Sequence, residues 1–233
     1  MDLDEICEIL ETYNGRDKII RTLCYSTKMF SGLSKDPLTS KRFSTFSKQM
    51  SATRAVLRML DDLPMLQTLL AYGLGKKEPD SYMSCMGVLR NVIDQLYYPI
   101  EKVAWLAEHD LINIQNPSAW DTASSVCWVA SIYLGLMKSI RYINVLQKHK
   151  LCLKSNPNAS AELLKLNMLQ QLEILSAVRS CFDFVHAVNT LPAGYLWSSR
   201  LNSWQVGLIG TISSIMGIWQ LLWKRSIAKN RKL

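Results

Sequence analysis

The sequence predicts an all-α membrane protein, with amphipathic helices in its N-terminal part and a transmembrane helix near its C-terminus. Apolar residues recur at helical spacing through most of the 233 residues, whereas the alternation typical of strands is scarce. Short breaks rich in glycine and proline separate the periodic stretches. The third observation is an uncharged apolar run at residues 204–223, with the sequence WQVGLIGTISSIMGIWQLLW.

Residues 204–223 have the length and composition of a helix that crosses a bilayer, which needs about 20 mostly apolar residues. Trp204, Trp219 and Trp223 stand where aromatic rings prefer the headgroup level. Residues 224–233 carry five basic and no acidic residues, so the positive-inside rule predicts a cytosolic C-terminus. The alternative interpretation is a buried helix of a soluble core.

Small residues recur four positions apart along this run, which would let another helix approach its backbone closely. This pattern predicts helix packing in the membrane and favours self-association of the protein. The predicted packing residues are Gly207, Gly210, Ser213, Ser214 and Gly217.

Residues 1–112 are predicted to form a cytosolic or interfacial helical region. Ten basic and two acidic residues fall between positions 16 and 60, and one amphipathic helix at about residues 38–60 carries much of this charge. Such a helix is typical of one lying in the membrane interface, although packing on neighbouring helices produces the same stripe. The predicted membrane-inserting residues are Phe43, Phe46, Met50, Leu57 and Leu60, and the predicted headgroup contacts are Lys41, Arg42, Lys48, Arg54 and Arg58.

Residues 113–203 are predicted to be helical, with a possible membrane segment at residues 122–137. That segment is uncharged but short for a span. If it crosses once between cytosolic termini, the basic residues that follow, from Lys138 to Lys154, lie on the far side, against the usual charge bias. The residues leave open whether it crosses, dips into the membrane or packs in a core.

No pattern in the sequence indicates a catalytic, cofactor or metal site. Gly73, Gly75 and Lys76 lack the spacing and the Ser or Thr of a phosphate loop. The three histidines are far apart, and the six cysteines include no Cys-x-x-Cys pair, so they predict reduced thiols. No nucleic-acid motif accompanies the net charge of +8, and anionic lipid is the favoured partner.

Several segments resemble the gamma branch of the peroxin eleven family. The most specific are YNGRDK at residues 13–18 followed by IIRTLCY at 19–25, and YYPIEKVAWLAEHDLI at 97–112. RMLDDLPMLQTLLAYGLG at 58–75 and residues 182–191 before the terminal span are also similar. The resemblance implies a peroxisomal membrane protein with both termini cytosolic, crossing the membrane once or several times.

The resemblance further implies that the protein elongates the peroxisomal membrane before fission and is not an enzyme. Its implied partners are the anionic phospholipid membrane, copies of itself, paralogues and the fission machinery. Two other functions stay open: a metabolite pore or transporter of that membrane, which would need several helices around a polar path, and an adaptor that only recruits fission factors.

Overall fold

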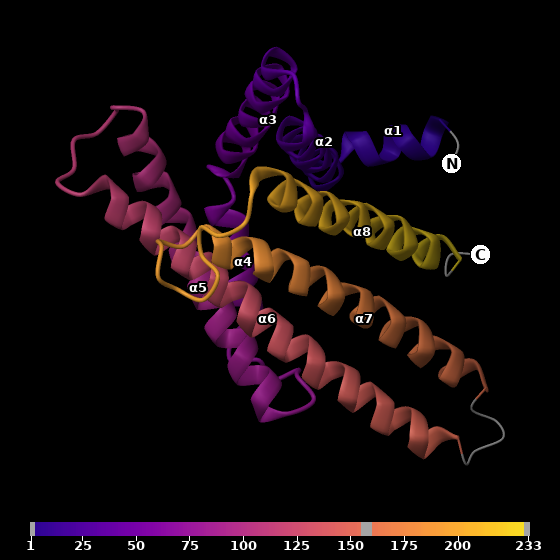
Figure 1. Ribbon diagram of the computed structural model, residues 1–233. Helices are drawn as coiled ribbons and strands as arrows, with labels where there is room; N and C mark the ends of the chain where they lie inside the picture. Colours follow the sequence, from indigo (N-terminus) through magenta and orange to yellow (C-terminus); the bar gives the residue numbers. More distant parts are fainter. Residues whose placement is uncertain (1–2, 155–159, 231–233) are drawn as a thin grey trace. The chain divides into compact units, whose positions relative to one another are not determined.

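The computed structural model describes residues 3–154 and 160–230 (Figure 1), and residues 231–233 of the predicted basic tail lie outside this part. Within it every regular element is a helix, which confirms the all-α prediction. The helices are α1 (Leu3–Glu11), α2 (Tyr13–Leu33), α3 (Pro37–Arg58), α4 (Asp62–Tyr72), α5 (Ser81–Glu108), α6 (Pro117–Leu153), α7 (Ser160–Asn189) and α8 (Ser203–Asn230).

The chain divides into two compact units. The first contains α1, α2 and α3 together with α8, so the two ends of the chain share one unit. The second contains α4, α5, α6 and α7. Within residues 3–154 and 160–230, two helices are long and apolar enough to cross a membrane by length and composition: α6, and residues Ser203–Ile227 of α8.

In the first unit, α8 packs on α2 through a face of small residues. A Cβ added at Gly207 would overlap the backbone of Met29, and one added at Gly210 would overlap the ring of Tyr25. From Gly207 to Gly210 of α8, the contacted residue of α2 moves back from Met29 to Tyr25. The two helices are therefore antiparallel. Close approach of the backbones therefore depends on glycine at these two positions of α8.

The remaining small residues of this face are also covered. Ser213 is fully buried and its hydroxyl accepts a hydrogen bond from Arg21 Nη2 at 3.4 Å, while Ser214 and Gly217 are buried. Further along, Arg225 Nη2 donates to the carbonyl oxygen of Glu8 at 3.2 Å. In this fold the second helix against the small-residue face is therefore α2 of the same chain.

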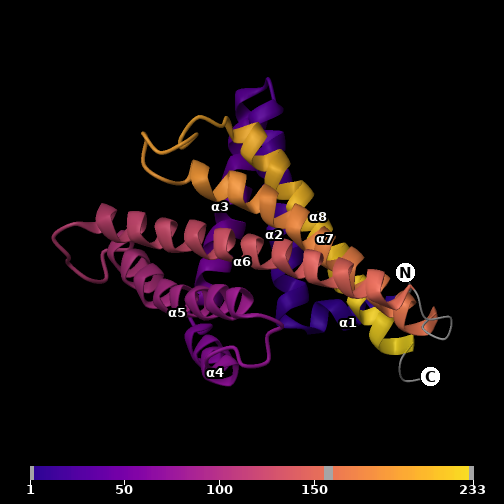
Figure 2. The same cartoon turned by 90° about the horizontal axis from the view of Figure 1, so that it is seen from below.

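In the second unit, α5 and α7 pack on opposite flanks of α6, and α4 packs on α5 (Figure 2). Helix α6 has 37 residues, which corresponds to about 55 Å at 1.5 Å per residue. Serine and glycine occupy most of its buried positions, so its neighbours approach closely and its larger apolar side chains point outward.

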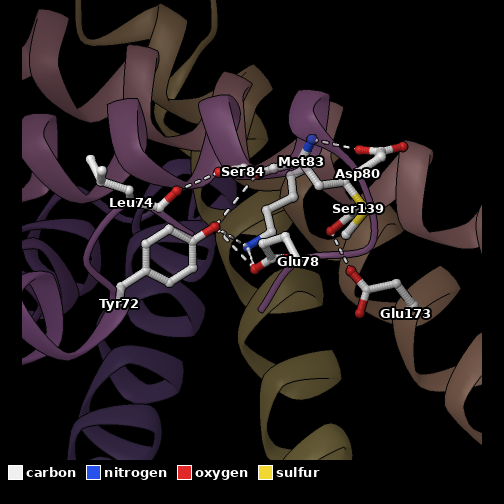
Figure 3. A network of polar contacts seen from close by, with 9 residues as sticks. Tyr72, Leu74, Glu78, Asp80, Met83, Ser84, Ser139 and Glu173 are labelled. Atoms are coloured by element: carbon white, nitrogen blue, oxygen red, sulfur yellow. Dashed lines mark hydrogen bonds and ion pairs between the residues drawn. The ribbon is translucent and has the colours of Figure 1, made fainter. Parts of the chain in front are cut away.

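A polar network ties the turn after α4 to α6 (Figure 3). Lys138 Nζ donates to Glu78 Oε1 at 2.7 Å and to the hydroxyl of Tyr72 at 3.2 Å. Arg141 Nε pairs with Asp80 Oδ2 at 2.6 Å. Two bases of the Lys138–Lys154 stretch are thus neutralised by acidic partners from the segment before α5.

We predict that Gly210→Leu lowers the stability of the first unit. The larger side chain must displace Tyr25, which typically costs about 1–3 kcal/mol. Thermal unfolding of the detergent-solubilised protein measures this loss. Ile215→Leu is the control, because Ile215 lies on the exposed face of α8; equal midpoints for the two variants would contradict the packing.

We also predict an acid-dependent loss of stability at Asp80. Hydrogen bonds from the backbone N–H of Met83 and from Arg141 lower the pKa of Asp80 below its ordinary 3.8. Because the folded-state pKa is the lower one, the contribution is complete above about pH 4 and lost as the pH falls through the lowered pKa. Asp80→Asn should flatten the decline of the unfolding midpoint below pH 4, whereas the exposed Asp121→Asn should leave it steep.

Candidate membrane-binding surface

Helix α3 begins at a well-defined cap. The carboxylate of Asp36 accepts hydrogen bonds from the backbone N–H of Thr39 at 2.9 Å and from its hydroxyl, and Pro37 occupies the first helical position, which suits its fixed φ. These bonds from Thr39 hold the pKa of Asp36 below its ordinary value. The helix ends at Arg58, two residues before the predicted boundary.

Small and polar residues form the seam between α2 and α3. Ser40 Oγ donates to the carbonyl oxygen of Ser31 at 2.8 Å, and Ser47 Oγ donates to that of Cys24 at 2.9 Å. The third step of the seam is the ion pair of Arg54 with Asp17, at 2.7 Å. Successive steps are seven residues apart on each helix, so the pair follows the heptad spacing of an antiparallel coiled coil.

This seam leaves the apolar stripe of α3 on an open flank. At 100° per residue the four predicted apolar residues within α3 are displaced from Ser47 by roughly 40° to 100°. Phe46 and Leu57 are exposed, while Phe43 and Met50 are half-buried beside the seam. Leu60 is 81% exposed but follows the end of α3 and belongs to the second unit. The stripe on α3 therefore ends at Leu57.

Helix α2 extends this apolar surface. The rings of Phe30 in α2 and Phe43 in α3 lie 5.9 Å apart. The faces of the two helices that carry these rings are therefore on the same side of the hairpin. Leu23, one heptad before Phe30, shares its face of α2, and both are exposed. We call the six residues of this surface the apolar plate: Leu23, Phe30, Phe43, Phe46, Met50 and Leu57. Leu23 and Tyr25 are two positions apart, so the plate lies opposite the α8 contact.

The predicted headgroup bases divide into two groups. Lys41, Arg42 and Lys48 are exposed. The side chain of Arg54 is only 14% exposed and pairs with Asp17, and Arg58 is half-buried with a partner of its own. Three of the five bases thus remain open to solvent, and Arg54 serves the seam of the hairpin instead.

Sequence reasoning missed Leu23, Phe30 and the role of Asp17. Apolar residues lie around much of the circumference of α2, so periodicity does not single out one apolar face. The face that stays exposed is defined only by the packing of α3 and α8 on the other faces. The heptad match of positions 17, 24 and 31 with 40, 47 and 54 is a signal that could have revealed the hairpin.

Fold and surface together define an all-α membrane protein with an amphipathic helical hairpin and two apolar helices of membrane-spanning length. The chain belongs to the peroxisomal biogenesis factor 11 (PEX11) family, whose pattern matches residues 3–222. This finding confirms the resemblance inferred from the sequence. Family membership and the two apolar helices support a location in the peroxisomal membrane and a role in peroxisome biogenesis.

Two curated relatives are similar over nearly their whole length. Peroxisomal membrane protein 11C of Homo sapiens is 35% identical over 229 residues, covering 94% of this chain and 93% of that protein. Peroxisomal membrane protein 11C of Mus musculus is 34% identical, with the same coverage. No solved structure matches the chain.

We predict that Asp17→Ala destabilises the α2–α3 hairpin by about 1–3 kcal/mol, because it leaves the shielded guanidinium of Arg54 without its carboxylate. Reversing the pair with Asp17→Arg and Arg54→Asp should recover part of the loss. Thermal unfolding of the four members of this cycle measures the coupling. Lys48→Ala, at an exposed position, should change little; purely additive effects of the two charge changes would contradict the pairing.

Proposed function

We propose that this chain elongates and remodels the peroxisomal membrane during proliferation and fission, by inserting the apolar plate into the cytosolic leaflet. The observation that carries this proposal is the outward apolar face of the α2–α3 hairpin. Its exposed members Leu23, Phe30, Phe46 and Leu57 remain uncovered by the packing of their own unit. Area added to one leaflet favours curvature of the bilayer.

The energies are sufficient for reversible membrane binding. Four side chains with roughly half of their surface still to bury contribute about 3–6 kcal/mol. Arg42, which flanks the stripe, adds about 1 kcal/mol beside anionic headgroups, whereas Lys41 and Lys48 project from the opposite flank of α3. The total of about 4–7 kcal/mol corresponds to dissociation constants in the micromolar to millimolar range, so anchoring by α8 is what makes the binding permanent.

The hairpin and α8 make different demands on the bilayer. Residues 16–60 carry ten bases, and each basic side chain at the bilayer centre costs about 2.5–3.5 kcal/mol on insertion scales. The hairpin therefore stays at the cytosolic surface while α8 crosses. Parting of α2 from α8 on insertion uncovers the small-residue face of α8.

That uncovered face supplies the contact for assembly. Gly207, Gly210 and Ser214, which accommodate α2 in the folded unit, then accommodate α8 of a second copy or of a paralogue. Assembly through the span concentrates plates on one leaflet and presents the cytosolic surface to the fission machinery. The same residues thus serve two partners in succession.

The test is deformation of anionic liposomes by the full-length protein. Phe46→Glu combined with Leu57→Glu should abolish tubulation, because carboxylates oppose insertion beside anionic lipid. Leu23→Glu combined with Phe30→Glu should have the same effect, since the plate spans both helices. If α3 alone inserted into the leaflet, Leu23→Glu combined with Phe30→Glu would leave tubulation unchanged.

Thr45→Glu combined with Ala52→Glu is the matched control, because both residues are exposed on the other flank of α3 and the charge change is identical. Undiminished tubulation by both plate variants would overturn the proposal. If the plate variants lose tubulation but fission factors still bind and peroxisomes still divide, the adaptor function is favoured instead.

A further inference from the structure

Helices α5 and α7 share with α6 a long zone of very low charge. Residues 122–137 of α6 are uncharged, residues 81–100 of α5 carry only Arg90 and Asp94, and residues 174–189 of α7 carry only Arg179 and Asp183. Each zone is electrically neutral. At 1.5 Å per residue they measure about 24 to 30 Å, close to the thickness of the hydrocarbon core.

The three zones lie side by side at the same level. Arg90 of α5 lies against Gly135 of α6. On the other flank, the rings of Trp128 and His186 lie 5.5 Å apart, and Ser139 Oγ donates to Glu173 Oε1 at 2.5 Å. These contacts make both neighbours antiparallel to α6 and bring the neutral stretches of the three helices into one layer.

Charges return together at one end of the layer. Lys138 and Arg141 of α6 pair with Glu78 and Asp80 just before α5, and Glu173 of α7 lies at the same level. At the opposite end the antiparallel register puts Asp121 of α6 and Glu101 of α5 at about the same level, while α7 ends there at Asn189 without a charged residue. A boundary of charge shared by three helices thus marks one face of a slab, and a boundary shared by α5 and α6 marks the other.

Most tyrosine and tryptophan residues of this unit lie near the same two levels, as they do where helices pass through headgroup regions, although Trp128 and Tyr133 lie between them. Tyr72, Tyr82 and Tyr142 accompany the cluster around Lys138. The opposite end carries Tyr97, Tyr98, Trp105, Trp120 and Tyr195. Between the two levels, large apolar side chains point outward from all three helices: Leu89, Val92, Leu96, Val126, Tyr133, Ile174 and Val178.

The four charges inside the zones have partners. Arg90 and Asp94 form an ion pair at 3.5 Å one turn apart, and Gly135 leaves room for the guanidinium. Arg179 and Asp183 both take part in interactions. Paired charges are the form in which ionisable residues occur inside membranes, and they lower the mean hydropathy of α5 and α7.

We infer that α5 and α7 cross the peroxisomal membrane beside α6, so that the outward apolar side chains of the layer contact lipid acyl chains and the chain crosses four times with α8. The inference is independent of the plate mechanism. It places the turn at 73–80 and the end of α6 on the cytosolic side, and residues 109–116 on the opposite side.

This topology removes the charge conflict noted in the sequence. With α6 and α8 as the only crossings, the bases from Lys138 to Lys154 face the peroxisomal interior. A crossing by α7 returns the chain, so that these bases and the basic tail from Lys224 onward share one side. The positive-inside rule is then satisfied by both groups.

Native cysteines test the inference in intact organelles. Cys152 and Cys181 are both exposed in the structure, but Cys181 lies near mid-level of the layer and Cys152 lies beyond its charged boundary. A membrane-impermeant maleimide should label Cys152 from the cytosol. Cys181 should react at least about tenfold more slowly until the protein is denatured, because a charged, water-soluble reagent does not enter the hydrocarbon core. Peptide mass spectrometry reads both sites in the unmodified chain.

A spin label at Cys181, with the other five cysteines changed to serine, identifies what covers the site. Collisions with oxygen exceeding those with a water-soluble nickel chelate support lipid contact. Efficient collision with the chelate, or low collision with both reagents as at a protein interface, overturns the inference. Cys152 protected in intact organelles also overturns it, as does His109→Cys labelled without permeabilisation.

Discussion

The first unit depends on the two small-residue contacts of α2. Serine and cysteine bring α3 close along one flank, with hydroxyl groups donating to backbone carbonyls, and glycine brings α8 close along another. Because neither contact consumes large apolar side chains, the phenylalanines and leucines of the hairpin are left on the outside. An ordinary amphipathic pair would have buried them, so the open plate is a consequence of the polar seam.

The sequence was sufficient for the helical class, the apolar segment at 204–223 and the stripe of α3, because each rests on local periodicity. It was insufficient wherever the partner is remote. Nothing near Arg54 indicates that Asp17, 37 positions earlier, neutralises it. The small face of α8 predicted a helix packed against it, and α2 lies there in the fold, but periodicity carries no information about whether such a helix belongs to the same chain or to another copy.

The layer of α5, α6 and α7 shows why a hydropathy average and a structure select different helices. Averages count Arg90 and Asp94 as two separate costs, whereas in the fold they form one ion pair beside a glycine. The free energy of transferring these two residues into the membrane is set by the ion pair and its surroundings. Membrane-crossing helices of moderate hydropathy are therefore recognised because their charged residues stop at the same level in neighbouring helices. That common level becomes visible only when the register of the three packed helices is known.

The contact of α2 with α8 and the passage of α8 through a bilayer oppose each other. Along its length α2 follows α8 antiparallel, so an upright α8 would carry Arg16, Lys18 and Lys28 of α2 into hydrocarbon. Their cost of about 2.5–3.5 kcal/mol each exceeds what a close glycine contact returns, since such interfaces are held mainly by van der Waals packing. Insertion of α8 thus favours release of the hairpin to the leaflet surface, and release places the plate, already uncovered, against lipid and exposes Gly207 and Gly210 to a second copy. Membrane binding and assembly are then consequences of one separation.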